Sequence, residues 1–187
     1  MSADRRAAVV EFLKRGGADK IYLHHRTLLT HLTGTENILR RWNAPKPLVA
    51  AGLIHAAYGT DGLASPLVAV DERQIVRDLV GDTAEKIVYV YGCCDRRFVY
   101  PQLSGAESVR WRDRFTAEEW TVDGEDLRQF MELTWANALE AAAGQTDADW
   151  DSVRLLFAMT SHLVSDSAMD TATATLGHMA PIPPTGR

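Results

Sequence analysis

The sequence has few of the features that mark cross-linked, membrane-spanning or phosphate-loop proteins. It contains two cysteines in 187 residues, and these are adjacent, at Cys93 and Cys94, where a disulfide between neighbours rarely forms. It has no CxxC pair, glycine-rich phosphate loop or nucleophile elbow. The N-terminal residues lack the apolar core of a signal peptide, and the longest apolar runs are too short to cross a bilayer. We therefore expect a cytoplasmic protein with reduced thiols and no membrane partner.

The charge balance argues against a nucleic-acid partner. Twenty Lys and Arg residues face 25 Asp and Glu residues, giving a net charge of -5, so no global positive field draws the protein to phosphate backbones. The length and the 46% hydrophobic content are enough to bury one sizeable core. We predict one domain over residues 1–180 and a disordered, proline-containing tail over residues 181–187.

Apolar residues recur mainly at intervals of three and four, which predicts an all-α fold. Helices are expected over residues 4–14, 24–42, 47–57 and 71–79, from 82 or 83 through 90, from 123 or 124 to 143, and from 147 or 149 through 164. The segment 47–57 is apolar almost all round and should form the central buried helix. Between residues 97 and 122 the periodicity fades among arginines and aromatics, and a short β-hairpin is expected there.

Two histidines are the strongest candidates for chemistry. His31 and His55 lie on consecutive predicted helices joined by a short turn, so the helices pack antiparallel and can bring both side chains into one buried space. Imidazole is both a common ligand of transition metals and a general base near neutral pH. A buried pocket containing both rings is therefore predicted.

Four segments resemble the HD superfamily, an all-α, phosphohydrolase-like family. They are the helix that carries His31, GLIHAAYGTDG around His55, ERQIVRDLVGDTAEKIVYVYG after it, and ELTWANALEA in the long helix. The nearest resemblance is to the hydrolase domain of guanosine tetraphosphate hydrolases, and it spans residues 28–139. It implies an HD-like helical bundle in which His31 and His55 match the two histidine ligands of the family's metal site.

The two carboxylate ligands of the resembled motif have no counterpart in this chain. Ala56 follows the second histidine where the motif has aspartate, and Asn137 is the best match to the distant aspartate. Ligand charge helps to set the affinity for hard divalent cations. The resemblance thus implies an HD-like pocket whose usual metal site is strongly weakened.

In one interpretation other groups rebuild the metal site. His31, His55 and Asp95 would form a set of two histidines and one carboxylate, which suits a divalent transition metal such as Fe, Zn or Mn and supports hydrolysis or oxidation. His24 lies seven residues before His31, close to the same helix face. Two turns separate these histidines by roughly 10 Å, so His24 would line the substrate pocket without sharing the ion.

In a second interpretation the protein is a metal-free enzyme that acts on a small polar or anionic molecule. His55 or His31 would act as the base or acid, with Tyr58 as a proton donor three residues beyond His55, in hydrolase-type or lyase-type chemistry. Arg96 and Arg97 would bind an anionic group of the substrate. Asn137 and His24 would complete the substrate contacts.

A third interpretation is a degenerate HD-like domain that binds a small ligand or a protein partner without turnover. The loss of both carboxylates favours it, whereas the cost of burying unused polar groups favours an enzyme. The tryptophans Trp111, Trp120 and Trp150 fit a homodimer interface as well as a core. We favour the enzyme as the leading hypothesis.

Overall fold

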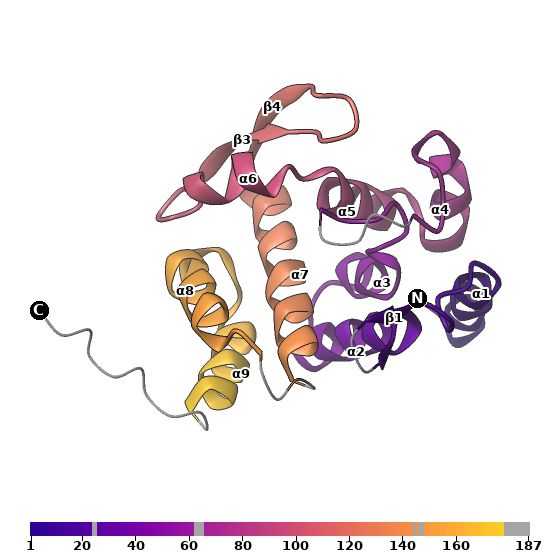
Figure 1. Ribbon diagram of the computed structural model, residues 1–187, viewed down its shortest axis with the longest axis horizontal. Helices are drawn as coiled ribbons and strands as arrows, with labels where there is room; N and C mark the ends of the chain where they lie inside the picture. Colours follow the sequence, from indigo (N-terminus) through magenta and orange to yellow (C-terminus); the bar gives the residue numbers. More distant parts are fainter. Residues whose placement is uncertain (24–25, 62–65, 144, 146–147, 178–187) are drawn as a thin grey trace, which may run out of the picture.

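The computed structural model describes residues 1–23, 26–61, 66–143, 145 and 148–177, which are mainly helical (Figure 1). The helices are α1 Ala3–Arg15, α2 Leu28–Arg41, α3 Lys46–Ile54, α4 Arg73–Val80, α5 Asp82–Cys93, α6 Arg96–Val99, α7 Gly124–Ala142, α8 Trp150–Thr160 and α9 Asp166–Gly177. Short 3-10 turns cover η1 Val70–Glu72, η2 Tyr100–Gln102 and η3 Ser161–Leu163. Two antiparallel hairpins pair β1 Tyr22–Leu23 with β2 Arg26–Thr27 and β3 Ser108–Arg112 with β4 Glu119–Asp123. The predicted mainly α fold and the hairpin within residues 97–122 are confirmed, although β4 extends one residue further.

Helix α3 occupies the centre of the molecule, as its apolar sequence predicted. Every residue from Leu48 to Ile54 is buried, and Pro47 lies in the first turn, where its missing N–H costs no hydrogen bond. Figure 1 shows α3 between α2 and α5, with α7 beside it, and α3 packs against all three of these helices. Gly52 permits the closest approach, because a Cβ atom there would lie 2.5 Å from Leu39 Cδ1 of α2. The helix therefore brings its C-terminal end, where His55 follows, between three other helices.

Helix α2 begins later than predicted. The expected start at residue 24 is wrong, because Arg26 and Thr27 pair as a strand with Tyr22 and Leu23. Thr27 then caps the helix, and its Oγ1 accepts a hydrogen bond from Thr30 N at 3.2 Å. His24 and the predicted tail over residues 181–187 lie outside the described residues.

The β3–β4 hairpin covers one end of α7. Trp111 is fully buried, and its ring meets Phe130 of α7 edge to face at 4.7 Å. Trp111 therefore belongs to the core and does not anchor a dimer. The segment before the hairpin contains the short helix α6, which Asp95 caps by accepting a hydrogen bond from Phe98 N at 3.2 Å.

The C-terminal part forms two helices instead of the single predicted one. Helix α8 ends at Thr160, and α9 follows after η3. Both lie on the side of α7 away from α3 (Figure 1). Trp135 of α7 stacks on Phe157 of α8 at 3.9 Å between ring centroids, and its Nε1 donates to Thr160 Oγ1 at 2.9 Å. These contacts attach α8 to the core.

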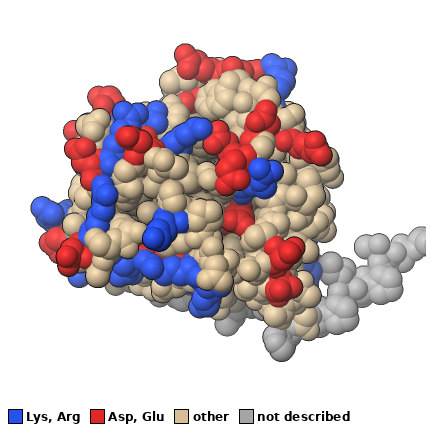
Figure 2. Space-filling model, turned by 180° about the vertical axis from the view of Figure 1, so that it is seen from behind, with Lys and Arg blue, Asp and Glu red and all other residues tan. Residues whose placement is uncertain are grey.

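Charges of both signs share the surface. On the face shown in Figure 2, acidic and basic side chains are scattered among neutral residues, and several of opposite sign lie next to each other. None of the helices in the described ranges is long and apolar enough to span a bilayer.

The attachment of α8 predicts a large effect for Phe157→Ala. Phe157 is 4% exposed and stacked on Trp135, so the variant should lose about 3 kcal/mol of unfolding free energy through a cavity and lost stacking. Leu155→Ala is the matched control on the same helix, since Leu155 is 62% exposed and should change stability by less than about 0.5 kcal/mol. Chemical denaturation measures both. Equal losses in the two variants would contradict this packing.

Candidate functional site

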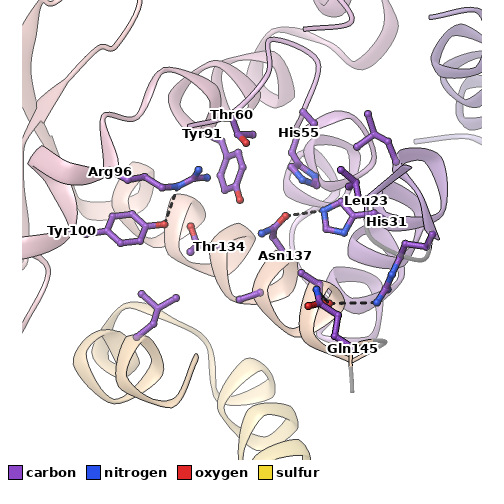
Figure 3. Close-up of a pocket in the computed structure, with 16 residues that line it drawn as sticks. Leu23, His31, His55, Thr60, Tyr91, Arg96, Tyr100, Thr134, Asn137 and Gln145 are labelled. Atoms are coloured by element: carbon purple, nitrogen blue, oxygen red, sulfur yellow. Dashed lines mark hydrogen bonds between the residues drawn. The ribbon is translucent and has the colours of Figure 1, made fainter. Parts of the chain in front are cut away.

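A pocket of about 330 Å³ lies between α2, α3, α5, α6 and α7. His31, His55, Ala56, Tyr91, Arg96 and Asn137 are among its lining residues. Figure 3 shows the side chains of His31, His55, Tyr91, Arg96 and Asn137 converging on one space. The two histidines selected from the sequence therefore share a pocket.

One buried carboxylate organises the α2 side of this pocket. Glu140 of α7, which is 7% exposed, accepts hydrogen bonds from His31 Nδ1 and Arg26 Nη1. Arg26 Nη1 also donates to the Glu140 backbone carbonyl at 2.9 Å. Gly34 leaves the necessary space, because a Cβ atom there would lie 2.6 Å from Glu140 Oε1. Glu140 thus joins the β1–β2 hairpin and α2 to α7 and opposes the charge of Arg26.

Asn137 contacts the other edge of the His31 ring. Its Oδ1 lies 2.9 Å from His31 Nε2, so both nitrogens of His31 have an oxygen partner. The ring centroids of His31 and His55 are 5.3 Å apart, edge to face. The structure thus brings together His31, His55 and Asn137, the three positions matched to the HD motif.

His55 is a neutral imidazole whose Nδ1 is held by the backbone. Its Nδ1 lies 2.9 Å from Gly52 O, and because a carbonyl only accepts, Nδ1 carries the proton and Nε2 has a lone pair. Burial and, to a smaller extent, the positive charges of His31 and Arg96 together lower the pKa of His55 to about 3. The ring is 1% exposed and lies 5.2 Å from the Tyr91 ring.

Tyr91 and Ala56 complete the environment of His55. Tyr91 of α5 is 1% exposed, and burial raises its pKa above the usual value, so its hydroxyl keeps its proton. Figure 3 shows this hydroxyl directed into the pocket toward Asn137. Ala56 lines the pocket with a methyl group at the position where the resembled motif has a carboxylate.

Arg96 supplies a positive charge on the opposite wall. Its Nε donates to Tyr100 Oη at 3.2 Å, and its guanidinium carbon lies 5.3 Å from the centre of the Tyr91 ring. Within the described residues no carboxylate pairs with Arg96, and no Asp or Glu lines the pocket. An arginine keeps its charge in any protein environment. The pocket therefore has an excess of positive charge.

Tyr58 does not lie beside His55 as the helical spacing predicted. Its hydroxyl donates to Glu85 Oε1 at 2.9 Å, and Glu85 also accepts hydrogen bonds from Arg73 and Arg77. The physical reason is that α3 ends at Ile54, before His55, so the interval of three residues no longer places two side chains on one face. Tyr58 therefore belongs to a buried polar cluster outside the pocket.

The expected metal ligands are not assembled. Asp95 caps α6 and lies 3.8 Å from Arg112 Nη1 instead of lining the pocket. Across the described part of the chain, no group of three or more His, Cys, Asp or Glu side chains is arranged to hold a metal ion. His31, His55 and Asp95 thus do not fit the predicted metal centre. Arg97 is exposed and lies outside the pocket, unlike Arg96.

Sequence reasoning missed Glu140 and Tyr91. Glu140 follows Asn137 by one helical turn, and Gly34 follows His31 by three residues, so each pair shares a helix face. The available signal in the sequence was a glycine, Gly34, on the helix of His31 and an acidic residue, Glu140, on the helix of Asn137. Nothing in the sequence around Tyr91 distinguishes it from a core tyrosine.

The comparisons with known proteins give one match. A family model described as "Domain of unknown function (DUF6817)" matches residues 12–96, which is fewer than half of the 187 residues. No curated protein and no solved structure matches the chain. The matched segment includes His31, His55, Tyr91 and Arg96 but ends before α7.

The space at Gly34 predicts the effect of Gly34→Ala. Alanine normally stabilises a helix relative to glycine by about 1 kcal/mol, but here its Cβ would displace the Glu140 carboxylate from His31 and Arg26. We expect a net loss of about 1 to 2 kcal/mol in unfolding free energy. Gly177→Ala is the control, because no atom lies within 4 Å of the added methyl group. Stabilisation of both variants would contradict the close approach.

The low pKa of His55 predicts a loss of stability in acid. The unfolded chain binds a proton near the ordinary pKa of 6.5, whereas the folded chain does so near 3, so stability is complete above pH 6.5 and falls as the pH drops toward 3. Between about pH 7.5 and about pH 5 the contribution lost is about 2 kcal/mol.

The His55→Gln variant tests this contribution, since it should remove that part of the pH dependence. His162→Gln, at an exposed position, is the control and should keep it. Urea unfolding at both pH values measures the difference. If the stability of wild type and His55→Gln depended on pH in the same way, the pKa of His55 would not be lowered by folding, and the prediction would be wrong.

Proposed function

We propose that the protein is a small-molecule enzyme that binds an organic anion in the His31/His55 pocket and performs metal-free acid–base chemistry on it. The observation that carries the proposal is Arg96, a pocket arginine without a carboxylate partner in the described residues, facing a neutral His55. Arg96 is half-buried, and taking a cation partly out of water without a counterion is costly. A ligand carboxylate or phosphate would supply the missing charge, with bidentate contacts to the guanidinium.

The neighbouring groups favour a particular division of roles. His55 Nε2 would accept a proton from the bound molecule, because Nδ1 is held by Gly52 O. The Tyr91 hydroxyl, which keeps its proton, would donate a hydrogen bond to the negative charge that develops on the substrate. Asn137 and His31 would orient the substrate.

Anion binding would also make His55 a stronger base. The positive charges of His31 and Arg96 help to hold its pKa at about 3, too low for an efficient base at neutral pH. A bound anion opposes both charges and so raises the pKa of His55. Proton transfer would thus be coupled to occupancy of the anion site.

The convergence of His31, His55 and Asn137 supports the proposal that the chain is a divergent relative of the HD superfamily. Ala56 and Asn137 in place of carboxylates explain why its chemistry would not use the family's metal. The second candidate function is ligand binding without turnover, which the low pKa of His55 favours.

The anion site can be tested by calorimetric titration with butanoate. Wild-type protein should bind it, and Arg96→Gln should weaken binding about tenfold or more, because a charge-assisted hydrogen bond is lost. Arg96→Lys should bind with intermediate affinity, since it keeps the charge without the fork of donors. Arg97→Gln is the matched control, because Arg97 is the exposed neighbour outside the pocket.

Nuclear magnetic resonance of the His55 ring separates the enzyme from the binding module. Butanoate should raise the pKa of His55 in the wild type and should have no such effect in Arg96→Gln. A bound anion with an unchanged pKa of His55 favours binding without turnover. Equal weakening by Arg96→Gln and Arg97→Gln would contradict the proposed site.

A further inference from the structure

A second, apolar groove of about 590 Å³ adjoins the pocket on the side of α8. The side chains that line only the groove include Pro101, Leu103, Val153, Leu155 and Met159. Leu155 is 62% exposed and adjoins the other apolar side chains of the groove, so together they form a contiguous apolar surface. Apart from Arg97, the charge in this groove comes from Arg96, and no Asp or Glu lines it.

The groove and the pocket meet at three shared residues. Arg96, Tyr100 and Leu156 line both cavities. Figure 3 shows Arg96 and Tyr100 linked by their hydrogen bond at the edge of the pocket that faces α8. An anion paired with Arg96 therefore lies where the polar pocket passes into the apolar groove.

We infer that the ligand is an amphiphilic anion, with its charged head on Arg96 in the pocket and an apolar chain in the groove along α8. This inference rests on the proposed anion site and specifies its substrate class. A fully polar anion would leave the groove and Leu155 in water, whereas an alkyl or aryl chain would remove this surface from solvent. The positive charge of Arg96 at the junction fixes which end of the ligand enters the pocket.

The test compares butanoate, octanoate and octanol as calorimetric probes, all below micelle-forming concentrations. Octanoate should bind at least about tenfold more tightly than butanoate, because additional methylene groups are buried. Octanol should bind more weakly than octanoate, because it lacks the charge for Arg96. Arg96→Gln should reduce octanoate affinity about tenfold or more.

The groove is tested by Met159→Glu, which places a carboxylate beside the proposed chain and should abolish the advantage of octanoate over butanoate. Ala158→Glu is the matched control, since Ala158 is exposed on the same helix and does not line the groove. Thermal unfolding of each variant checks that the fold is retained. Dodecanoate, with a longer chain, extends the series and should bind at least as tightly as octanoate.

The outcomes separate this inference from the proposed function. Equal affinities for butanoate and octanoate, both lost in Arg96→Gln, would overturn the amphiphilic ligand and leave the anion site standing. Binding of no anion, or binding unaffected by Arg96→Gln, would overturn the anion site itself. Octanol binding as tight as octanoate binding would also overturn the inference. So would a dimer that Leu155→Glu dissociates, because a second copy would then cover the groove.

Discussion

The burial of the Glu140 carboxylate is the constraint on which the pocket depends. It accepts hydrogen bonds from His31 and Arg26, which come from α2 and the preceding hairpin, while Glu140 itself comes from α7. A buried carboxylate needs such partners, and the Arg26 guanidinium needs a carboxylate in turn. Gly34 makes the contact possible, because any larger residue would fill the space. The position of His31 relative to α7 follows from this interaction.

The same interaction decides the charge of the pocket. Because the Glu140 carboxylate contacts His31 and Arg26, it does not form an ion pair with Arg96 on the opposite wall. Two other buried carboxylates are also occupied by arginines: Glu36 by Arg6 and Arg40, and Glu85 by Arg73 and Arg77. The buried Asp113 and Glu132 accept hydrogen bonds from Tyr89 and from Ser165 N instead. A chain with a net charge of -5 therefore contains a positively charged pocket, because these buried acidic groups have their partners elsewhere.

The site consists of two neighbouring cavities that differ in polarity. The pocket brings hydrogen-bonding groups from α2, α5, α6 and α7 around a neutral His55, whereas the groove along α8 is almost entirely apolar. Arg96 belongs to both. The position of Arg96 depends on the short helix α6, which Asp95 caps. Asp95, which was considered as a metal ligand, therefore has a structural role instead.

The mainly α fold, the buried helix α3 and the pairing of His31 with His55 could be predicted from sequence, because each depends on hydrophobic periodicity over one or two adjacent segments. The start of α2 and the position of Tyr58 could not, since a two-residue strand and the end of α3 at Ile54 override helical spacing. The sequence by itself predicted that the two histidines would share a buried pocket, and the resemblance added Asn137 to the expected site. Only the tertiary structure decided that Glu140 would join His31, that Tyr91 would face His55 and that Arg96 would lack a counterion. The physical reason is that hydrogen bonds and ion pairs between distant segments depend on how helices pack, which no local pattern encodes.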